Sequence, residues 1–197
     1  MVTIKILTGS VRPGRFNDQV ANWLYAVAQK REDMKVELLD LSKINLPFLD
    51  EPSPPKMHKY TKEHTKEWSK TVDKGDGFIF ITPEYNHSYS AVLKNAIDYL
   101  FYEWNYKPVT LVSYGSLAGG ARAIEHLRGV AAELKMYDLQ ETILLPNYWT
   151  NLDEKGQYKF TEDLDTRANE VLTELIFWSE KMKTARAELK GESPDFD

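Results

Sequence analysis

The sequence contains no cysteine among its 197 residues. This absence excludes disulfide bonds, thiolate zinc sites, cysteine-ligated iron–sulfur clusters and catalysis by a thiol. Long apolar runs are also missing, since no stretch reaches the roughly 18–20 residues of a membrane span. The formal net charge of −5 gives no positive field that would favour nucleic acid or an anionic membrane. The N-terminal segment lacks the pattern of a signal peptide, so we expect a soluble, cytoplasmic protein.

What the chain does contain is typical of a globular protein. Hydrophobic residues make up 42% of it and aromatic residues 12%. Its length suits one domain of ordinary size, and no repeat or linker divides it. We therefore expect a single domain over residues 1–197, with a polar, frayed tail at residues 190–197.

Short apolar runs alternate with segments of helical periodicity. The predicted strands cover residues 2–7, 35–41, 77–83, 108–115 and 141–146. The predicted helical faces cover residues 16–27, 57–72, 89–100, 121–134 and 164–189. Residues 45–55 hold four of the nine prolines and are expected to form an irregular loop. The alternation indicates an α/β fold with a parallel sheet and helices on both faces.

Three loops follow predicted strands where a ligand would bind. In an open parallel sheet, ligands bind outside the carboxyl ends of the strands, where the strand order reverses. This rule selects residues 8–17, 82–90 and 113–122. All three loops are rich in Gly, Ser, Asn, Tyr or Arg, so together they are the candidate binding site.

The first loop, LTGSVRPGRFN, has two glycines with the spacing of a phosphate-binding P-loop. A P-loop also needs Lys and then Ser or Thr after the second glycine, where this chain has Arg15 and Phe16. A dinucleotide-binding loop would need glycine in place of Val11. Asp40, a candidate ribose ligand, lies further along the chain than that motif places its acidic residue. Neither nucleotide motif fits well.

Two interpretations of this loop remain open. Ser10, Arg12 and Asn17 could hold a phosphate monoester without a metal, helped by N–H groups at the start of the following helix. The same residues could instead turn the chain and cap that helix.

The other two loops favour a ligand. In PEYNHSYS, Tyr85 and His87 offer ring faces, and Asn86 presents donors and acceptors in one plane. In SYGSLAGGARA, Gly119 and Gly120 allow close backbone approach or a positive φ. Each loop alone could be an ordinary turn. Three such loops at one sheet edge instead predict a binding site. The first loop would hold a phosphate, the second would lie beside a planar ring, and the glycine-rich third loop, called the glycine shelf below, would let a ligand approach the backbone.

Three segments resemble the signature regions of the NADPH-dependent FMN reductase family. They are GSVRPGRFN, PEYNHSYSAVLKNAIDYL and SYGSLAGGARAIEHLRGVAAEL. NLPFLDEP is also similar to that family, and the resemblance spans residues 2–145. It implies a flavodoxin-like, doubly wound five-stranded parallel sheet of order 2-1-3-4-5 in an αβα sandwich. It further implies bound FMN, NADPH or NADH as donor, quinones, azo compounds, free flavin or metal oxyanions as acceptors, and a homodimer or tetramer.

The resemblance also assigns residues by position. Ser10, Arg12 and Asn17 match phosphate ligands, whereas Arg15 stands where the family often has serine. His87 and Arg122 are candidates for the substrate or NAD(P)H side. The full set predicted to bind the cofactor is Ser10, Arg12, Arg15, Phe16, Asn17, Pro83, Glu84, Tyr85, Asn86, Ser113, Tyr114, Gly115, Gly119 and Gly120.

Other chemistry has little support. The flavin would carry the reaction, so no catalytic side chain is required. No metal site is expected, because His58 and His64 point to different faces of a helix. His126 is expected to be a partly exposed helix residue. Three carboxylates are expected to be solvated or ion-paired: Glu84, Asp98 and Glu103.

The predicted function is a ping-pong FMN-dependent NAD(P)H oxidoreductase. An alternative is a non-enzymatic FMN protein, either an electron carrier or a redox sensor, although carriers of flavodoxin type tend to be more acidic. A third option, a response-regulator domain, lacks the acidic cluster after the first strand. The aromatic residues Tyr89, Phe101, Tyr102 and Trp104 predict a surface for self-association.

Overall fold

The computed structural model describes residues 1–192, and their side chains as far as residue 189. The strands are β1 (Val2–Thr8), β2 (Met34–Asp40), β3 (Gly77–Pro83), β4 (Pro108–Gly115), β5 (Tyr137–Asp138) and β6 (Ile143–Pro146). The helices are α1 (Asn17–Gln29), α2 (Leu41–Ile44), α3 (Glu63–Asp73), α4 (Ala91–Asp98), α5 (Ala121–Glu133) and α6 (Glu162–Glu192), with 3₁₀ turns η1 (Pro55–Met57) and η2 (Tyr148–Asn151). Of the tail predicted to fray, residues 190–192 belong to α6, and the rest lies outside the described residues.

The strands form one parallel sheet of order β2-β1-β3-β4-β5, which confirms the predicted flavodoxin-like order. The predicted fifth strand, residues 141–146, corresponds to β6, and a short strand that was not predicted, β5, precedes it. A two-residue β5 pairs with the start of β4, and β6 pairs with its end. Sequence periodicity missed β5 because two residues are too few to show alternation.

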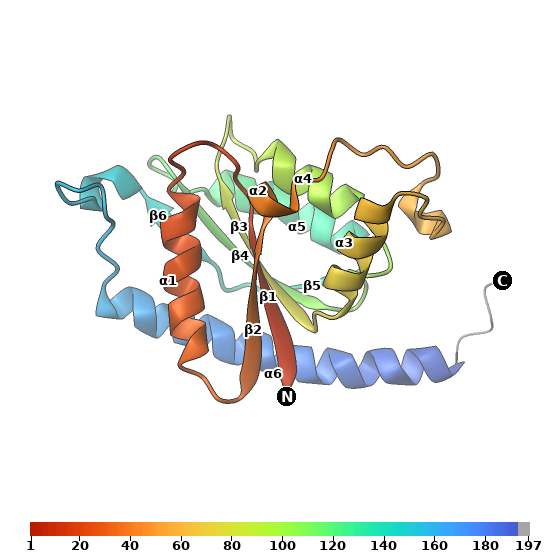
Figure 1. The fold of residues 1–197 in the computed structure, drawn as a ribbon. Helices are drawn as coiled ribbons and strands as arrows, with labels where there is room; N and C mark the ends of the chain where they lie inside the picture. The colour runs from red at the N-terminus through yellow and green to blue at the C-terminus, as the bar shows by residue number, and fades with distance from the viewer. Residues whose placement is uncertain (193–197) are drawn as a thin grey trace.

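Helices cover both faces of the sheet (Figure 1). Helices α1 and α6 pack on one face, and α3, α4 and α5 on the other. Strands β1, β3 and β4 are almost wholly buried because they lie between the two layers. This burial explains their unbroken apolar sequences, which are typical of central parallel strands.

The second predicted helical segment begins later than its apolar stripe suggests. The stripe starts at Met57, but α3 begins at Glu63. His58 adopts a left-handed conformation with φ 51°, which ends the short η1 turn before a helix can continue. Helix α2 was not predicted, and it starts where the Asp40 side chain accepts a hydrogen bond from the Ser42 N–H.

The aromatic surface predicted after α4 is largely absent. Trp104 is fully buried and Phe101 is 7% exposed, because both pack in the core between α3, α4 and α5. Tyr102 alone of these aromatic residues is exposed, at 52%. The sequence-based argument for self-association through this segment was therefore wrong. Within residues 1–192, no helix is both long and apolar enough to cross a membrane.

Candidate functional site

A cavity of about 270 Å³ lies at the carboxyl-end edge of the sheet, where the loops after β1, β3 and β4 meet. The three loops chosen from the sequence thus come together at one place (Figure 1). The cavity is lined by Arg12, Arg15, Phe16, Pro83, Glu84, Tyr85, Tyr114, Gly115, Ser116, Tyr148 and Trp149.

The loop after β1 is fixed to its neighbours at its first residue. The Gly9 N–H donates to the Ile81 carbonyl at 2.7 Å, and the Ser90 hydroxyl donates to the Gly9 carbonyl. Ser90 is also the N-cap of α4, accepting from the Leu93 N–H. The start of α4 therefore holds the start of this loop.

The loop is suited to an anion. Gly14 has φ +66°, which lets the backbone turn sharply before α1. Among the described residues, the N–H groups of Val11, Phe16 and Asn17 have no acceptor. The Arg12 side chain is exposed and makes no hydrogen bond or ion pair within the described chain. Free N–H groups at a helix N-terminus beside a free guanidinium form a cradle for phosphate.

Three residues of the first loop that were predicted to bind the cofactor have partners within the protein. The Asn17 side chain is fully buried, and its amide donates to the Ile81 carbonyl at 3.3 Å. Ser10 is 1% exposed, and its hydroxyl lies 3.3 Å from the Tyr85 hydroxyl. Arg15 lines the cavity, but its guanidinium is paired with Asp40 and Asp18. These contacts within the protein fix the shape of the loop.

The loop after β3 forms one wall. Tyr85 and Ser88 pair around Asn86 and His87, which have φ 48° and 67°. Positive φ at both central residues gives a tight two-residue turn that lifts Tyr85, 40% exposed, beside the cavity. The Asn86 and His87 side chains are exposed at the tip and do not line the cavity.

Glu84 joins this wall to α5. Its carboxylate accepts hydrogen bonds from the Arg122 side chain and, at 3.2 Å, from the Arg122 N–H. Its own N–H donates to the Tyr114 carbonyl at 3.0 Å. Arg122, predicted as a nicotinamide phosphate contact, is thus engaged by a carboxylate, although its side chain remains 42% exposed.

The loop after β4 is a compact glycine shelf. Gly119 and Gly120 both have positive φ, at 61° and 94°, as their pattern predicted. A side chain on Gly120 would collide with Ser113, so the backbones approach closely here. Ser113 is fully buried, and its hydroxyl donates to the Thr82 carbonyl at 2.8 Å. Gly115 and Ser116 face the cavity from this loop.

Sequence reasoning missed two aromatic residues of the site, Tyr148 and Trp149. They lie in η2, directly after β6, and close the cavity from that side. The Tyr148 ring stacks on Phe16, with centroids 4.2 Å apart, and Phe16 meets Tyr114 edge to face. Burial raises the pKa of the Tyr114 hydroxyl, so that group stays neutral. The sequence signal that could have found Tyr148 and Trp149 is their position: they are aromatic residues in a turn that follows a predicted strand, like Tyr85.

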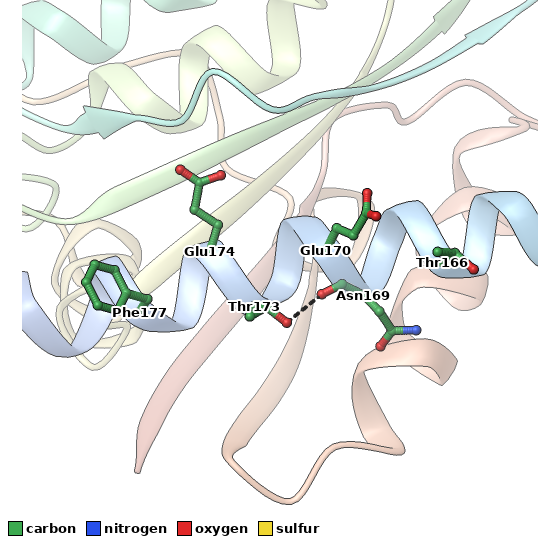
Figure 2. Close-up of a pocket in the computed structure, with 6 residues that line it drawn as sticks. All are labelled: Thr166, Asn169, Glu170, Thr173, Glu174 and Phe177. Carbon is green, nitrogen blue, oxygen red and sulfur yellow. Dashed lines mark hydrogen bonds between the residues drawn. The ribbon is translucent and has the colours of Figure 1, made fainter.

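A second depression lies on α6, away from these loops. Its walls are the side chains of one helix, and the Thr173 hydroxyl donates to the Asn169 carbonyl along that helix (Figure 2). Its polar groups do not converge on a common point (Figure 2). The depression is a solvated helix surface, lined by Thr166, Asn169, Glu170, Thr173, Glu174 and Phe177.

Three further ionisable residues considered in the sequence, Asp98, Glu103 and His126, have partners within the protein. Asp98 pairs with Lys94 at 2.5 Å. Buried Glu103 accepts from the Tyr60 and Ser69 hydroxyls at 3.1 and 2.6 Å. His126 is exposed on α5, with its ring 3.0 Å from the Ser88 hydroxyl. No group of three metal-binding side chains occurs in the part of the chain that the structure describes.

Comparisons with known proteins agree with this geometry. The chain matches the sequence model of the family described as NADPH-dependent FMN reductase over residues 2–150. An NAD(P)H-dependent FMN reductase of Schizosaccharomyces pombe is 43% identical over 135 residues, which are 68% of this chain and 67% of that protein. An NAD(P)H:quinone oxidoreductase of Solanum tuberosum is 29% identical over 167 residues, 83% of this chain and 81% of the relative.

A solved structure shows the same fold. A flavoenzyme NAD(P)H:(acceptor) oxidoreductase from Paracoccus denitrificans aligns with a TM-score of 0.71 at 21% identity, over 92% of this chain and 99% of its own. The family match covers β1 to the end of β6 and so includes the loops that build the cavity. The chain belongs to the NADPH-dependent FMN reductase family.

Proposed function

We propose that this protein is an FMN-dependent NAD(P)H oxidoreductase that passes electrons to quinones, azo compounds, free flavin or similar small acceptors. The observation that carries the proposal is the cavity at the carboxyl-end edge, with a phosphate cradle at one end and aromatic walls beside it. Family membership and the relatives' activities support the same conclusion.

The residues present fit FMN. The free N–H groups of the loop after β1, with the exposed Arg12 guanidinium, would hold the phosphate. Pro83 to Tyr85 and the glycine shelf at Gly115 would flank the ring. When bound, FMN supplies hydride acceptance and electron transfer. Tyr148 and Trp149 would exclude water from the opposite side.

In this proposal one cavity serves both donor and acceptor. Within the described residues, the other cavities found lie away from the three loops or lack aromatic walls on both sides. NAD(P)H and the acceptor would therefore bind in turn against the same open face, which predicts ping-pong kinetics. The protein's own contribution is position, electrostatics and shielding, since hydride transfer needs no acid or base from the chain.

We also propose a homodimer in the cytoplasm. Large apolar side chains are exposed in the loops at the carboxyl-end edge, including Phe48 at 84%, Leu117 at 85% and Trp149 at 49%. A second copy would bury them and cover the cavity mouth. Light scattering at micromolar concentration is expected to give twice the chain mass, and a monomer would contradict this arrangement.

The proposed location in the cytoplasm has a separate basis. The lack of cysteine suits a reducing compartment, and cell fractionation tests the location.

The decisive experiment is a spectrum followed by turnover. Purified protein loaded with FMN is expected to show flavin absorbance after desalting and to oxidise NADPH or NADH when a quinone is added. An azo dye in place of the quinone tests the second acceptor class. Protein that retains no FMN would refute the proposal. Protein that retains FMN but leaves both nucleotides unoxidised would instead be an electron carrier or a redox sensor.

A further inference from the structure

Arg15 joins three parts of the loop after β1 and its surroundings. Its Nε donates to the Asp18 carboxylate at 2.7 Å, in the first turn of α1. Its Nη2 lies 2.9 Å from both carboxylate oxygens of Asp40, at the end of β2. Its Nη1 donates to the carbonyl of Ser10. All three guanidinium nitrogens are thus engaged, and the side chain is only 8% exposed.

Asp40 is held as firmly as its partner. Its Oδ1 also accepts from the Thr8 hydroxyl at 3.1 Å and from the Ser42 N–H and hydroxyl at 2.9 and 2.8 Å. Desolvation opposes ionisation of this carboxyl, but the hydrogen bonds from Ser42 and Arg15 outweigh it and keep its pKa below the usual value. Asp40 is therefore an anchored carboxylate that fixes the Arg15 fork.

This arrangement leaves Arg15 little attraction for an anion. One guanidinium faces two carboxylates, Asp18 and Asp40, so the local charge of the three groups is negative. Arg12 has no such partner among the described residues and remains the cation available to a phosphate.

The contact with Ser10 has a geometric consequence. A trans peptide unit is planar, and its C=O and N–H point in opposite directions. Because Arg15 draws the Ser10 carbonyl toward itself, the N–H of Val11, in the same peptide unit, points away from Arg15. That N–H is one of the loop donors that have no acceptor in the described chain.

We propose that Arg15, held by Asp40, is a positioning residue that presets the phosphate loop by orienting the Ser10–Val11 peptide, rather than a ligand of the phosphate. The inference rests on the proposed function, because it needs a flavin phosphate as the anion. It assigns the charge contact to Arg12 and the preorganisation of the backbone donors to the Arg15–Asp40 pair.

The test compares FMN with riboflavin, which lacks the phosphate. The dissociation constants of both flavins are measured by fluorescence titration for the wild type, Arg15→Gln and Asp40→Asn. The ratio of the riboflavin constant to the FMN constant reports the phosphate contribution alone. Asp33→Asn is the matched control, because it breaks an exposed pair with Arg31 just before the other end of β2.

We expect Arg15→Gln and Asp40→Asn each to lower this ratio by about tenfold, as for loss of one oriented hydrogen bond to a charged group. Riboflavin affinity is expected to stay within about twofold, because the ring walls do not depend on the pair. Asp18→Asn removes only the Nε contact and is expected to lower the ratio less. The control is expected to leave both constants unchanged.

Each other outcome overturns the inference in a distinguishable way. If Arg15→Gln lowers the ratio while Asp40→Asn preserves or raises it, Arg15 contacts the phosphate directly. If both variants weaken FMN and riboflavin equally, the pair only supports the fold. If wild-type protein binds the two flavins equally, the phosphate site itself is refuted. Wild-type binding of neither flavin would refute the proposed function as well.

Discussion

Arg12 and Arg15 stand three residues apart in one loop but have opposite surroundings. The Arg12 guanidinium is exposed to solvent, whereas the Arg15 guanidinium lies between two carboxylates. A free guanidinium can reorganise to meet a phosphate with two parallel hydrogen bonds. An arginine already held by carboxylates would first have to lose those contacts.

Arg12→Ala is expected to weaken FMN binding. A hydrogen bond to a charged group contributes roughly 1.5–3 kcal/mol, so the dissociation constant should rise by about 10- to 100-fold. Flavin fluorescence titration measures it. Arg167→Ala on the exposed part of α6 is the control for loss of one positive charge. An FMN affinity that is the same in Arg12→Ala and the wild type would contradict the phosphate assignment.

Gly120→Ala tests the glycine shelf. Gly120 has φ +94°, and an added Cβ would lie 2.9 Å from the Tyr114 backbone nitrogen and collide with Ser113. Strain of this kind costs of order 1–3 kcal/mol, so a lower free energy of unfolding is expected in urea titration. Gly129→Ala, within α5, the helix that Gly120 precedes, is the matched control. Its Cβ meets nothing within 4 Å, and alanine there should stabilise by about 0.5–1 kcal/mol. Equal effects of the two substitutions would contradict the strain argument.

Residue types selected three loops that meet at one cavity but did not fix the direction of each side chain. Gly119 and Gly120 were read correctly because positive φ depends on the local backbone. Asn17 and Ser113 were predicted to face the ligand, yet each bonds a carbonyl of the neighbouring β3. Such a choice depends on the distance to a strand far away in sequence, which no local pattern contains. Trp149 escaped notice for a similar reason, since only the fold brings η2 to the cavity.

At the scale of elements, the proline-rich segment between α2 and α3 (residues 45–62) is irregular apart from the η1 turn. Polar side chains of α4 and the residue after it hold it in place. The Asn95 amide donates to the Pro47 carbonyl at 2.7 Å, and the Tyr99 hydroxyl lies 3.1 Å from the same carbonyl and from the Asp50 carboxylate. The sequence predicted an irregular loop here, but not the contacts that order it, because they join it to a helix more than forty residues away.

The Glu51 side chain joins the middle of the proline-rich segment to its last two residues, directly before α3. Its carboxylate accepts the N–H groups of Thr61 and Lys62 at 2.8 and 2.9 Å. Desolvation opposes its charge, but these backbone hydrogen bonds outweigh that effect and lower the pKa from 4.5 to about 2. Between these two values the unfolded chain binds more protons than the folded one, so stability from Glu51 is complete above about pH 4.5 and is lost toward pH 2.

Glu51→Gln is therefore expected to destabilise the protein at pH 6 and to lose that effect as the pH falls. Urea unfolding of both proteins at pH 6, 4.5 and 3 measures the difference in the free energy of unfolding. Glu154→Gln, at an exposed position in the loop before α6, is the control. A difference between Glu51→Gln and wild type that is the same at all three pH values would contradict the assigned role of the carboxylate.

At the scale of the whole molecule, α6 completes the core although it lies beyond the family match. The match ends at residue 150, while Ala168, Leu172 and Leu175 are fully buried against α1 and the sheet. Ion pairs also attach this helix to the sheet. Buried Asp76, directly before β3, pairs with Lys183 and Arg186 of α6 at 2.9 and 3.0 Å. The apolar spacing along residues 164–189 predicted the helix, and burial of this stripe shows that it serves the core.

Because one sheet carries both cores, we infer that the described chain unfolds as a single unit. Leu172→Ala, at a fully buried position of α6 that does not line the cavity, is expected to cost about 2–5 kcal/mol through the space left in the core. Helix content by circular dichroism and release of FMN by fluorescence should then shift to lower urea together. Glu180→Ala, at an exposed position of α6, should shift neither. Loss of α6 signal at a urea concentration where FMN stays bound would mean that this helix folds apart from the site.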